Sequence, residues 1–325
     1  MKKRYRVYSE ELVHRINELN YDLTKEQYQD SRPEIFEQEK ERWERVTKQF
    51  FNFSNPITIV DIGTGTGFVP LTIAKFAKKE DTFICSDVSR GILSVAKRNI
   101  VKKNFHCQFR FVKLESQVPF QLPFETESAD MLTVNSVLHH VKDTNAFLNE
   151  MNRILRPNGL LFVAHEPNRY FYENKFLWHN YLFMNSLDPA NFEDTAHKIL
   201  RRMYLDNIVK KIYYSLYPKR RENALEYERI TSKINETLLE EELIRKPLLP
   251  EEIIDAVEIR DKEGFKPNLL FPNYDLLHFE TYNHISSVTV RHYNSSIIRK
   301  YDRLLRRRYP QAGATFFTVF KKIEK

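Results

Sequence analysis

Short apolar runs alternate with segments of helical pattern between residues 57 and 166, and this alternation limits the fold more than any other feature. Strands and helices that alternate along a chain are typical of parallel sheets with helices on both faces. We therefore predict an α/β fold with a doubly wound, Rossmann-like sheet. The predicted strands are 57–60, 82–86, 107–114, 130–135 and 160–166, with helices near 68–79, 89–101 and 143–155 and a turn at LRPNG, 155–159.

The alternation stops after residue 166 and resumes near the end of the sequence. Residues 276–285 and 314–323 read as two further strands with a helix near 294–308 between them, which makes the sheet seven-stranded. A link between strands usually takes a few residues, so the long helix-rich stretch before residue 276 predicts an inserted helical cap. The predicted parts are N-terminal helices at 1–52, a core of 53–168 with 276–325, and the cap at 169–275, between the fifth and sixth strands.

Composition narrows the class of protein. The net charge of +7 on 325 residues predicts a mildly basic surface, suited to anionic substrates or membrane faces. No apolar stretch is long enough to span a bilayer, and the N-terminal residues lack the apolar core of a secretory signal. Two cysteines without CxxC spacing indicate a reducing compartment, so we expect a cytoplasmic protein. The oligomeric state is left open.

Three of the seven glycines lie close together in VDIGTGTGF, directly after the first predicted strand. A glycine-rich turn there lets a ligand touch the main chain. The spacing Gly63-x-Gly65-x-Gly67 differs from the dinucleotide and phosphate-loop fingerprints, which disfavours NAD and ATP. Asp87 ends the second strand, and an acid at this place can accept hydrogen bonds from ribose hydroxyls. The alternatives are a plain tight turn and a helix N-cap at Asp87.

Four stretches, VDIGTGTGF, CSDVS, NSVLHHV and LNEMNRILRPNGLLFVAHEPN, resemble successive motifs of class I S-adenosylmethionine-dependent methyltransferases over about residues 50–168. The resemblance implies S-adenosyl-L-methionine as the cofactor. It places the methionine half near Asp61, Gly63, Thr64, Gly65 and Gly67, the ribose at Asp87, the adenine at Val88, and the methyl group near Asn135 and Ser136. The chain has KLESQ where many members carry Gly-Asp-Ala, so Glu115 or Gln117 would meet the adenine amine.

A base is needed when the methyl acceptor is an alcohol or phenol. Candidates at the ends of the fourth and fifth strands are His139, His140, His165 and Glu166. The histidines could instead start a helix and bond to the backbone. Their spacing does not predict a metal site.

The acceptor is predicted to be a small or medium organic molecule, methylated at oxygen: a metabolite, a sugar or a lipid-linked compound. NSVL replaces the Asn/Asp-Pro-Pro-Tyr/Phe motif of base-amine methylases, and neither cysteine follows a proline as in carbon-5 pyrimidine methylases. Both absences lower the case for a nucleic-acid substrate. The alternatives are an RNA methyltransferase and a non-catalytic scaffold. The aromatic cluster at 170–183 could wall a substrate pocket, cover the cofactor or form the core of the cap.

Overall fold

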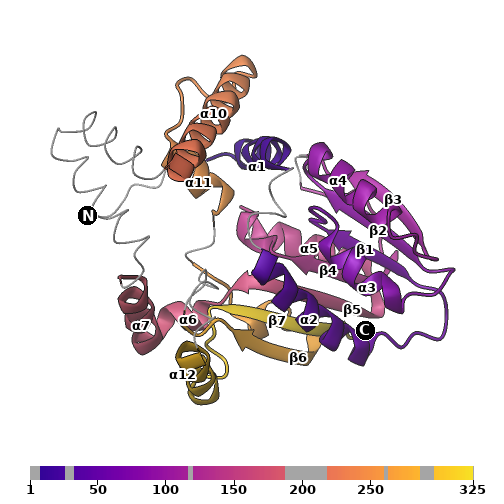
Figure 1. Cartoon of the computed structure of the whole chain (residues 1–325). Helices are drawn as coiled ribbons and strands as arrows, with labels where there is room; N and C mark the ends of the chain where they lie inside the picture. The colour runs from indigo at the N-terminus through magenta and orange to yellow at the C-terminus, as the bar shows by residue number, and fades with distance from the viewer. Residues whose placement is uncertain are drawn as a thin grey trace.

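The computed structural model describes residues 8–25, 33–115, 120–186, 218–259, 263–285 and 296–324. A seven-stranded sheet runs through them in the order β3-β2-β1-β4-β5-β7-β6 (Figure 1). Strands β1 to β5 are parallel, and β7 lies antiparallel between β5 and β6. The strands are β1 Thr58–Ile62, β2 Thr82–Asp87, β3 Gln108–Lys113, β4 Ala129–Asn135, β5 Leu155–Pro167, β6 Tyr274–Tyr282 and β7 Thr315–Lys322.

Side-chain caps fix where the core helices begin. Ser89 accepts a hydrogen bond from the N–H of Ile92 and starts α4, and Asp143 does the same for Ala146 at the start of α5. Gly67, with a φ of 94°, starts α3 directly after the glycine turn. The helices are α1 Glu10–Thr24, α2 Pro33–Phe50, α3 Phe68–Ile73, followed by the short turn η1 Ala74–Phe76, α4 Arg90–Val101, and α5 Thr144–Ile154, preceded by η2 Leu138–His140.

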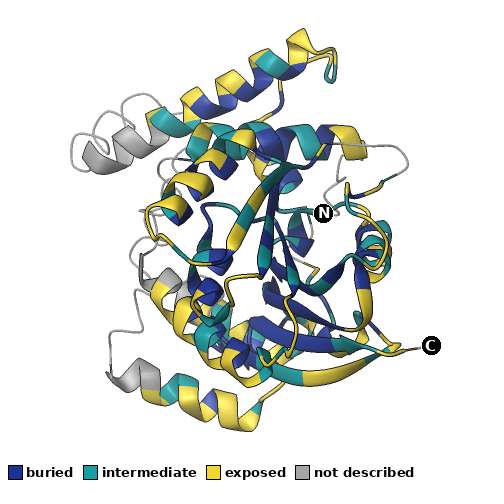
Figure 2. Cartoon of the chain, turned by 90° about the vertical axis from the view of Figure 1, so that its right-hand side faces the viewer, coloured by how far each residue is buried: buried dark blue, intermediate teal, exposed yellow. Residues whose placement is uncertain are grey.

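Helices cover both faces of the sheet. Alternate strand residues point to opposite faces, so Ile59 packs with α2, α3 and α4 on one side, and Val60 packs with α5 on the other. Figure 2 shows that the strands are largely buried and the outer helix faces exposed. The doubly wound, Rossmann-like seven-stranded fold predicted from the sequence is confirmed.

The predicted turn at 155–159 is wrong in one respect, because these residues already belong to β5. Leu155 pairs with Ala129 on β4, and the register shifts before Met131. Asn158 adopts a φ of 64° next to Gly159, so the turn-forming residues bend the strand locally. The chain therefore passes from α5 into the strand without an intervening loop.

The described part of the 169–275 segment is mostly helical, with α6 Arg169–Glu173, α7 Lys175–Ser186, α10 Pro218–Glu240, α11 Pro250–Val257 and the short η3 Pro267–Leu269. These helices belong to two separate apolar clusters. Helices α10 and α11 pack with α1, while α6 and α7 pack with α12, Ser296–Arg308 (Figure 1). The boundaries of a cap domain stay a prediction. Among the described helices, none combines the length and apolarity that a membrane crossing requires.

Candidate active site

A cavity with about 1160 Å³ of empty space, including its open mouth, lies at the carboxyl ends of β1, β2 and β4. Ligand sites of open α/β sheets form at this edge. Its wall combines three groups: the loops after the strands, residues 120–147 and helix α1. The lining residues are Glu10, Val13, His14, Asn17, Tyr21, Ile62, Gly63, Gly65, Asp87, Val88, Ile92, Leu114, Glu115, Phe120, Leu122, Asn135, Ser136, Val137, His140, Val141, Lys142, Asp143 and Phe147.

The glycine turn presents bare main chain to this cavity. Gly63, Gly65 and Gly67 all have positive φ angles, which favour glycine. A methyl group built on Gly63 would lie 2.3 Å from Val137, whereas one built on Gly65 would meet nothing within 4 Å. Gly65 therefore offers the open surface of the turn, and Gly63 allows the turn to approach the loop after β4.

Asp87 connects the glycine turn to the start of α4. One carboxylate oxygen accepts the Gly65 N–H at 2.8 Å, and the other accepts the Ser89 N–H at 2.9 Å. Burial raises the pKa of Asp87 to about 6, although both hydrogen bonds counteract it. The helix cap at α4 is Ser89. Asp87 thus lines the cavity as a carboxylate with room for further donors.

Three members of the predicted cofactor set, Asp61, Thr64 and Gly67, are absent from the cavity lining. Asp61 is 1% exposed and accepts hydrogen bonds from the hydroxyls of Thr64 at 2.7 Å and Thr133 at 2.5 Å. Burial raises its pKa to about 7. These residues support the glycine turn from behind.

The end of β4 brings Asn135 and Ser136 to the cavity. The Trp43 indole on α2 donates to Asn135 Oδ1 at 2.9 Å, which fixes the amide. Glu115 also lines the cavity and pairs with Lys113 at 2.7 Å. Gln117, the other predicted adenine contact, lies outside the described residues.

Helix α1 supplies cavity residues that the sequence did not single out. Asn17 is 5% exposed, its amide nitrogen donates to Val13 O at 2.9 Å, and its Oδ1 atom has no hydrogen-bond partner. An orphaned buried acceptor on a cavity wall indicates a donor on a ligand. The amphipathic pattern of α1 could have predicted a packed helix, but it carries no motif that places it over this edge of the sheet.

His140 is the predicted base candidate that lines the cavity. Its Nδ1 atom lies 2.6 Å from Val257 O, so Nδ1 carries the proton and Nε2 accepts from the Tyr21 hydroxyl at 2.9 Å. Burial, followed by the charge on His139, lowers the pKa of His140 to about 4. His140 is therefore a neutral acceptor at the cavity wall, and Tyr21 joins it from α1.

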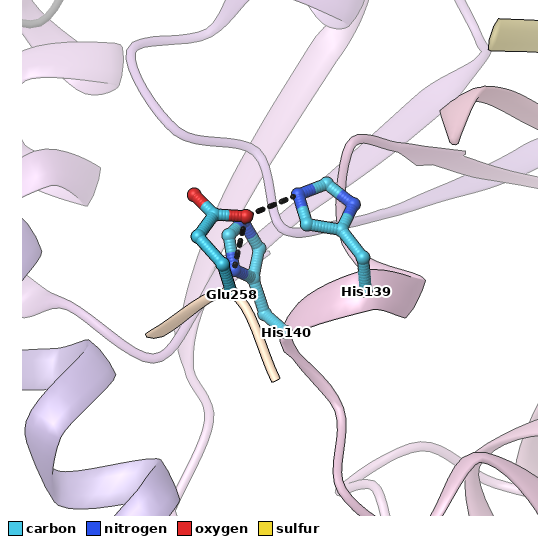
Figure 3. Close-up of side chains that lie close together, drawn as sticks. All are labelled: His139, His140 and Glu258. Carbon is cyan, nitrogen blue, oxygen red and sulfur yellow. Dashed lines mark ion pairs between the residues drawn. The ribbon is translucent and has the colours of Figure 1, made fainter. Parts of the chain in front are cut away.

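His139 and Glu166 form a buried ion pair outside the cavity lining. Glu166 accepts the N–H groups of Val137 and Leu138 and the Nδ1 proton of His139 at 2.7 Å. His139 Nε2 lies 3.3 Å from Glu258, just past α11 (Figure 3). Burial lowers the His139 pKa, but Glu166 and Glu258 outweigh it and raise the value to about 10.

The ligand atoms of His139, His140 and Glu258 lie within 4.8 Å of one another. A metal would have to displace the His139 proton shared with Glu258 and, at His140, either the Nδ1 proton donated to Val257 O or the hydrogen bond from Tyr21 to Nε2. We therefore interpret the cluster as an ion-paired clamp between α11 and the loop after β4.

His165, the remaining base candidate, joins α2 instead of the cavity. Its Nδ1 atom lies 3.3 Å from the Glu39 carboxylate and 3.4 Å from the Tyr282 hydroxyl. A positive φ of 55° at a break in the β5–β7 register turns its side chain to this network. The structure thus groups His139, His140 and Glu166 after β4, places His165 at α2, and brings only His140 of these four to the cavity lining.

Comparison with known proteins identifies the domain that carries this cavity. A family model described as a methyltransferase domain matches residues 60–163, from β1 into β5. This chain contains a class I S-adenosylmethionine-dependent methyltransferase domain. The match includes the glycine turn, Asp87 and the loop after β4.

Curated relatives of this methyltransferase domain carry names from quinone biosynthesis. The ubiquinone/menaquinone biosynthesis C-methyltransferase of Teredinibacter turnerae is 27% identical over 121 residues, which cover 37% of this chain and 47% of that protein. The demethylmenaquinone methyltransferase of Oceanobacillus iheyensis is 28% identical over 224 residues, covering 64% and 91%. The chain thus spans less than half of the first relative's length.

A solved S-adenosylmethionine-dependent methyltransferase from Aquifex aeolicus is similar with a TM-score of 0.34 and 21% identity, covering 39% of this chain and 64% of that chain.

The aromatic side chains at 170–183 are absent from the cavity lining. Phe171 and Leu177 share a cluster with Leu305 on α12. Most of the aromatic segment therefore packs in a helical cluster away from the cavity, while Phe176 and Phe183 are exposed.

Proposed function

We propose that this protein is an S-adenosylmethionine-dependent methyltransferase and that the cofactor binds in the cavity after β1, β2 and β4. One observation carries the proposal: an open glycine turn, a buried carboxylate and an orphaned amide oxygen meet at one cavity, from Gly65, Asp87 and Asn17. The lining fits a nucleoside with an amino-acid tail because it offers main chain, acceptors and apolar surface together.

The cofactor-binding residues follow from these contacts. Asp87 would hold the ribose hydroxyls, Val88 would contact the adenine, and Asn17 Oδ1 would accept an N–H of the cofactor. Gly63 and Gly65 would contact the methionine half, and Asp61, Thr64 and Gly67 would support the turn from behind. Glu115, Asn135 and Ser136 complete the proposed wall. Bound S-adenosylmethionine supplies an electrophilic methyl group at this place.

For the acceptor we propose a hydroxylated aromatic ring that is methylated at carbon. The relatives named above are a C-methyltransferase and a demethylmenaquinone methyltransferase, and they lend no support to the oxygen acceptor predicted from the sequence. A phenolic ring carbon becomes nucleophilic when its hydroxyl loses a proton. Methylation at oxygen and methylation at a phenolic ring carbon therefore both need a group in the cavity that accepts the hydroxyl proton.

Tyr21 and His140 are suited to receive this proton. The Tyr21 hydroxyl donates to His140 Nε2, His140 Nδ1–H donates to Val257 O, and both side chains line the cavity. The low pKa of His140, caused by its burial, keeps the imidazole neutral at neutral pH. We propose that the acceptor hydroxyl donates to the Tyr21 oxygen and that its proton passes through Tyr21 to His140 Nε2 as the methyl group is transferred. The methylated ring carbon then loses its own hydrogen as a proton, which restores the aromatic ring and its hydroxyl group.

The test is a product assay with labelled S-adenosylmethionine and a panel of hydroxylated aromatic and quinol acceptors. We expect a carbon-methylated product whose hydroxyl group can still be acetylated. His140→Ala is expected to lower turnover by about 10²–10⁴-fold, and Tyr21→Phe to lower it less. Both variants should keep the cofactor dissociation constant within a few-fold.

Two results would change the assignment. A methyl ether as the sole product would show that methylation takes place at oxygen, as predicted from the sequence. If calorimetry shows that S-adenosylmethionine and S-adenosylhomocysteine do not bind the folded wild-type protein, the proposed methyl transfer is wrong. Binding without transfer to any acceptor, including RNA, would favour the non-catalytic scaffold.

A further inference from the structure

Helices α7 and α12 lie together at the side of the molecule away from α1 and α10 (Figure 1). The Tyr301 hydroxyl on α12 donates to Asn180 on α7 at 2.8 Å. Leu177 and Leu305, both buried, belong to the apolar cluster between the two helices. Each helix therefore has one face against its partner and another toward solvent.

The solvent face of α12 is basic. Lys300, Arg303 and Arg307 are exposed and follow one another at spacings of three and four residues, which places them on one helical face, and the exposed Arg308 lies at the edge of this face. Leu304 lies among them and is 61% exposed. Arg306 points elsewhere, since it donates to Glu280 on β6.

The solvent side of α7 carries large apolar side chains beside the exposed Lys175 and His179. Phe176, Leu182 and Phe183 are 51%, 47% and 61% exposed. Phe176 and Phe183 lie seven residues apart and share one face of the helix, Leu182 lies next to Phe183, and all three side chains point away from the side of the buried Leu177. Large apolar side chains gathered on one face usually mark an interaction site.

The two faces meet at Tyr309, just after α12. The Phe176 ring stacks on the Tyr309 ring with centroids 5.8 Å apart, and Arg308 Nε donates to the Tyr309 hydroxyl at 3.3 Å. These contacts join Phe176 on α7 to the basic C-terminal end of α12. We name the exposed apolar and basic side chains of these two helices the α7–α12 surface: Phe176, Leu182, Phe183, Lys300, Arg303, Leu304, Arg307 and Arg308.

We propose that the α7–α12 surface binds the headgroup region of an anionic lipid bilayer. Cations attract the negative surface of such a membrane, and exposed leucine and phenylalanine side chains enter the interface beside them. A nucleic acid would use the same cations, but it offers no apolar layer for Leu182 and Leu304. The proposal goes beyond the methyl-transfer reaction and, with it, indicates an acceptor that resides in lipid.

The experiment measures sedimentation of the full chain with phosphatidylglycerol–phosphatidylcholine vesicles and with pure phosphatidylcholine vesicles. We expect binding to the anionic vesicles that weakens as salt is added, because salt screens exposed charges. The triple variant Arg303→Gln, Arg307→Gln, Arg308→Gln should lose affinity on the order of a hundredfold. The variant Leu182→Ser, Phe183→Ser should weaken binding at every salt concentration.

The matched control removes three exposed cations elsewhere: Lys79→Gln, Lys102→Gln, Lys103→Gln. It should bind like the wild type, and circular dichroism should show that every variant is folded. Equal losses in the control and the α12 variant, or no binding of the wild type to anionic vesicles, would overturn the proposal. Tight binding of an RNA oligonucleotide in place of vesicles would assign the surface to nucleic acid. Vesicle binding is measured without cofactor, so its failure leaves the methyl-transfer proposal untouched.

Discussion

At the residue scale, the Asp87 carboxylate decides how the cavity receives a ribose. It holds the Gly65 and Ser89 N–H groups and is buried, which raises its pKa to about 6. We expect Asp87→Ala to weaken S-adenosylmethionine binding by about 1–3 kcal/mol, because ribose hydroxyls lose a charged acceptor. Titration calorimetry measures this, with the exposed Asp275→Ala as control. An unchanged dissociation constant would remove Asp87 from the ribose site.

Substitutions at Gly65 and Gly67 distinguish two effects on cofactor binding: loss of contact with the ligand, and strain in the glycine turn. Both have positive φ angles, so an alanine is strained at either place. A methyl group at Gly65 enters open space at the cavity, whereas at Gly67 it lies 3.4 Å from the backbone of Ala96. We expect the cofactor dissociation constant to rise about tenfold more in Gly65→Ala than in Gly67→Ala. Both variants should have a lower melting temperature.

Calorimetry and thermal melting of the two glycine variants check this prediction. Equal loss of affinity in both variants would mean that the strain of the turn, and not its exposed surface, governs binding.

Asp61 shows what sequence reasoning could not place at this scale. The motif indicates an acid beside the glycine turn, but its partner Thr133 comes from the pairing of β1 with β4, where Asp61 lies opposite Thr133. Strand register depends on contacts far apart in the sequence. The same limit applies to Glu166, whose oxygens bind the loop after β4.

At the scale of elements, a buried ion pair links α11 to the loop after β4. His139 lies between Glu166, which is fully buried, and Glu258, whose side chain is 41% exposed. Removing one partner of a buried pair leaves an uncompensated charge. We expect Glu166→Gln to cost about 3–5 kcal/mol of unfolding free energy, and Glu258→Gln about 0–1 kcal/mol. Urea unfolding of both variants checks this, and similar losses would contradict the burial argument.

The same pair predicts a pH dependence of stability. Burial opposes the charge on His139, but Glu166 and Glu258 raise its pKa from 6.5 to about 10. A raised histidine pKa contributes stability that is complete below pH 6.5 and is lost as the pH rises through about 10. The unfolding free energy should therefore fall between about pH 7 and 10, and less steeply in His139→Gln. Parallel pH profiles for the two proteins would contradict this.

The sequence predicted the helices of the insertion but not their partners. The prediction came from a helix-rich stretch without a strand pattern, which says nothing about α1, whose Ile16 shares an apolar cluster with Ile234 and Ile253. A helical pattern fixes which face is buried, while the identity of the covering element follows from the whole fold. The helices of the insertion accordingly belong to two separate apolar clusters, and the cluster of α10 and α11 packs against α1 at the cavity.

At the scale of the whole molecule, the cavity has a floor and a cover of different origin. The floor comes from β1, β2 and β4, whose alternation with helices predicts both the sheet and its ligand edge. The cover comes from α1, which is tied down by Asp22 to the N–H of Gly91 at 2.7 Å and by Glu18 to Lys113 at 2.8 Å. These polar ties join segments far apart in sequence, so no local pattern revealed them.

Cofactor binding should therefore stabilise α1 together with the core. A ligand that contacts Asn17 and Tyr21 as well as Gly65 connects α1 to the strand ends below it. At a ligand concentration of about a hundred times the dissociation constant, binding adds about 2.7 kcal/mol to the unfolding free energy. We expect hydrogen exchange of α1 amides to slow on addition of S-adenosylhomocysteine, with α7 and α12 unchanged. Protection confined to the strands, with α1 exchanging as before, would mean that the cofactor lies under the glycine turn without touching the helix. Asn17→Leu would then bind as tightly as the wild type, whereas contact with α1 predicts about a fivefold to hundredfold loss from the missing acceptor.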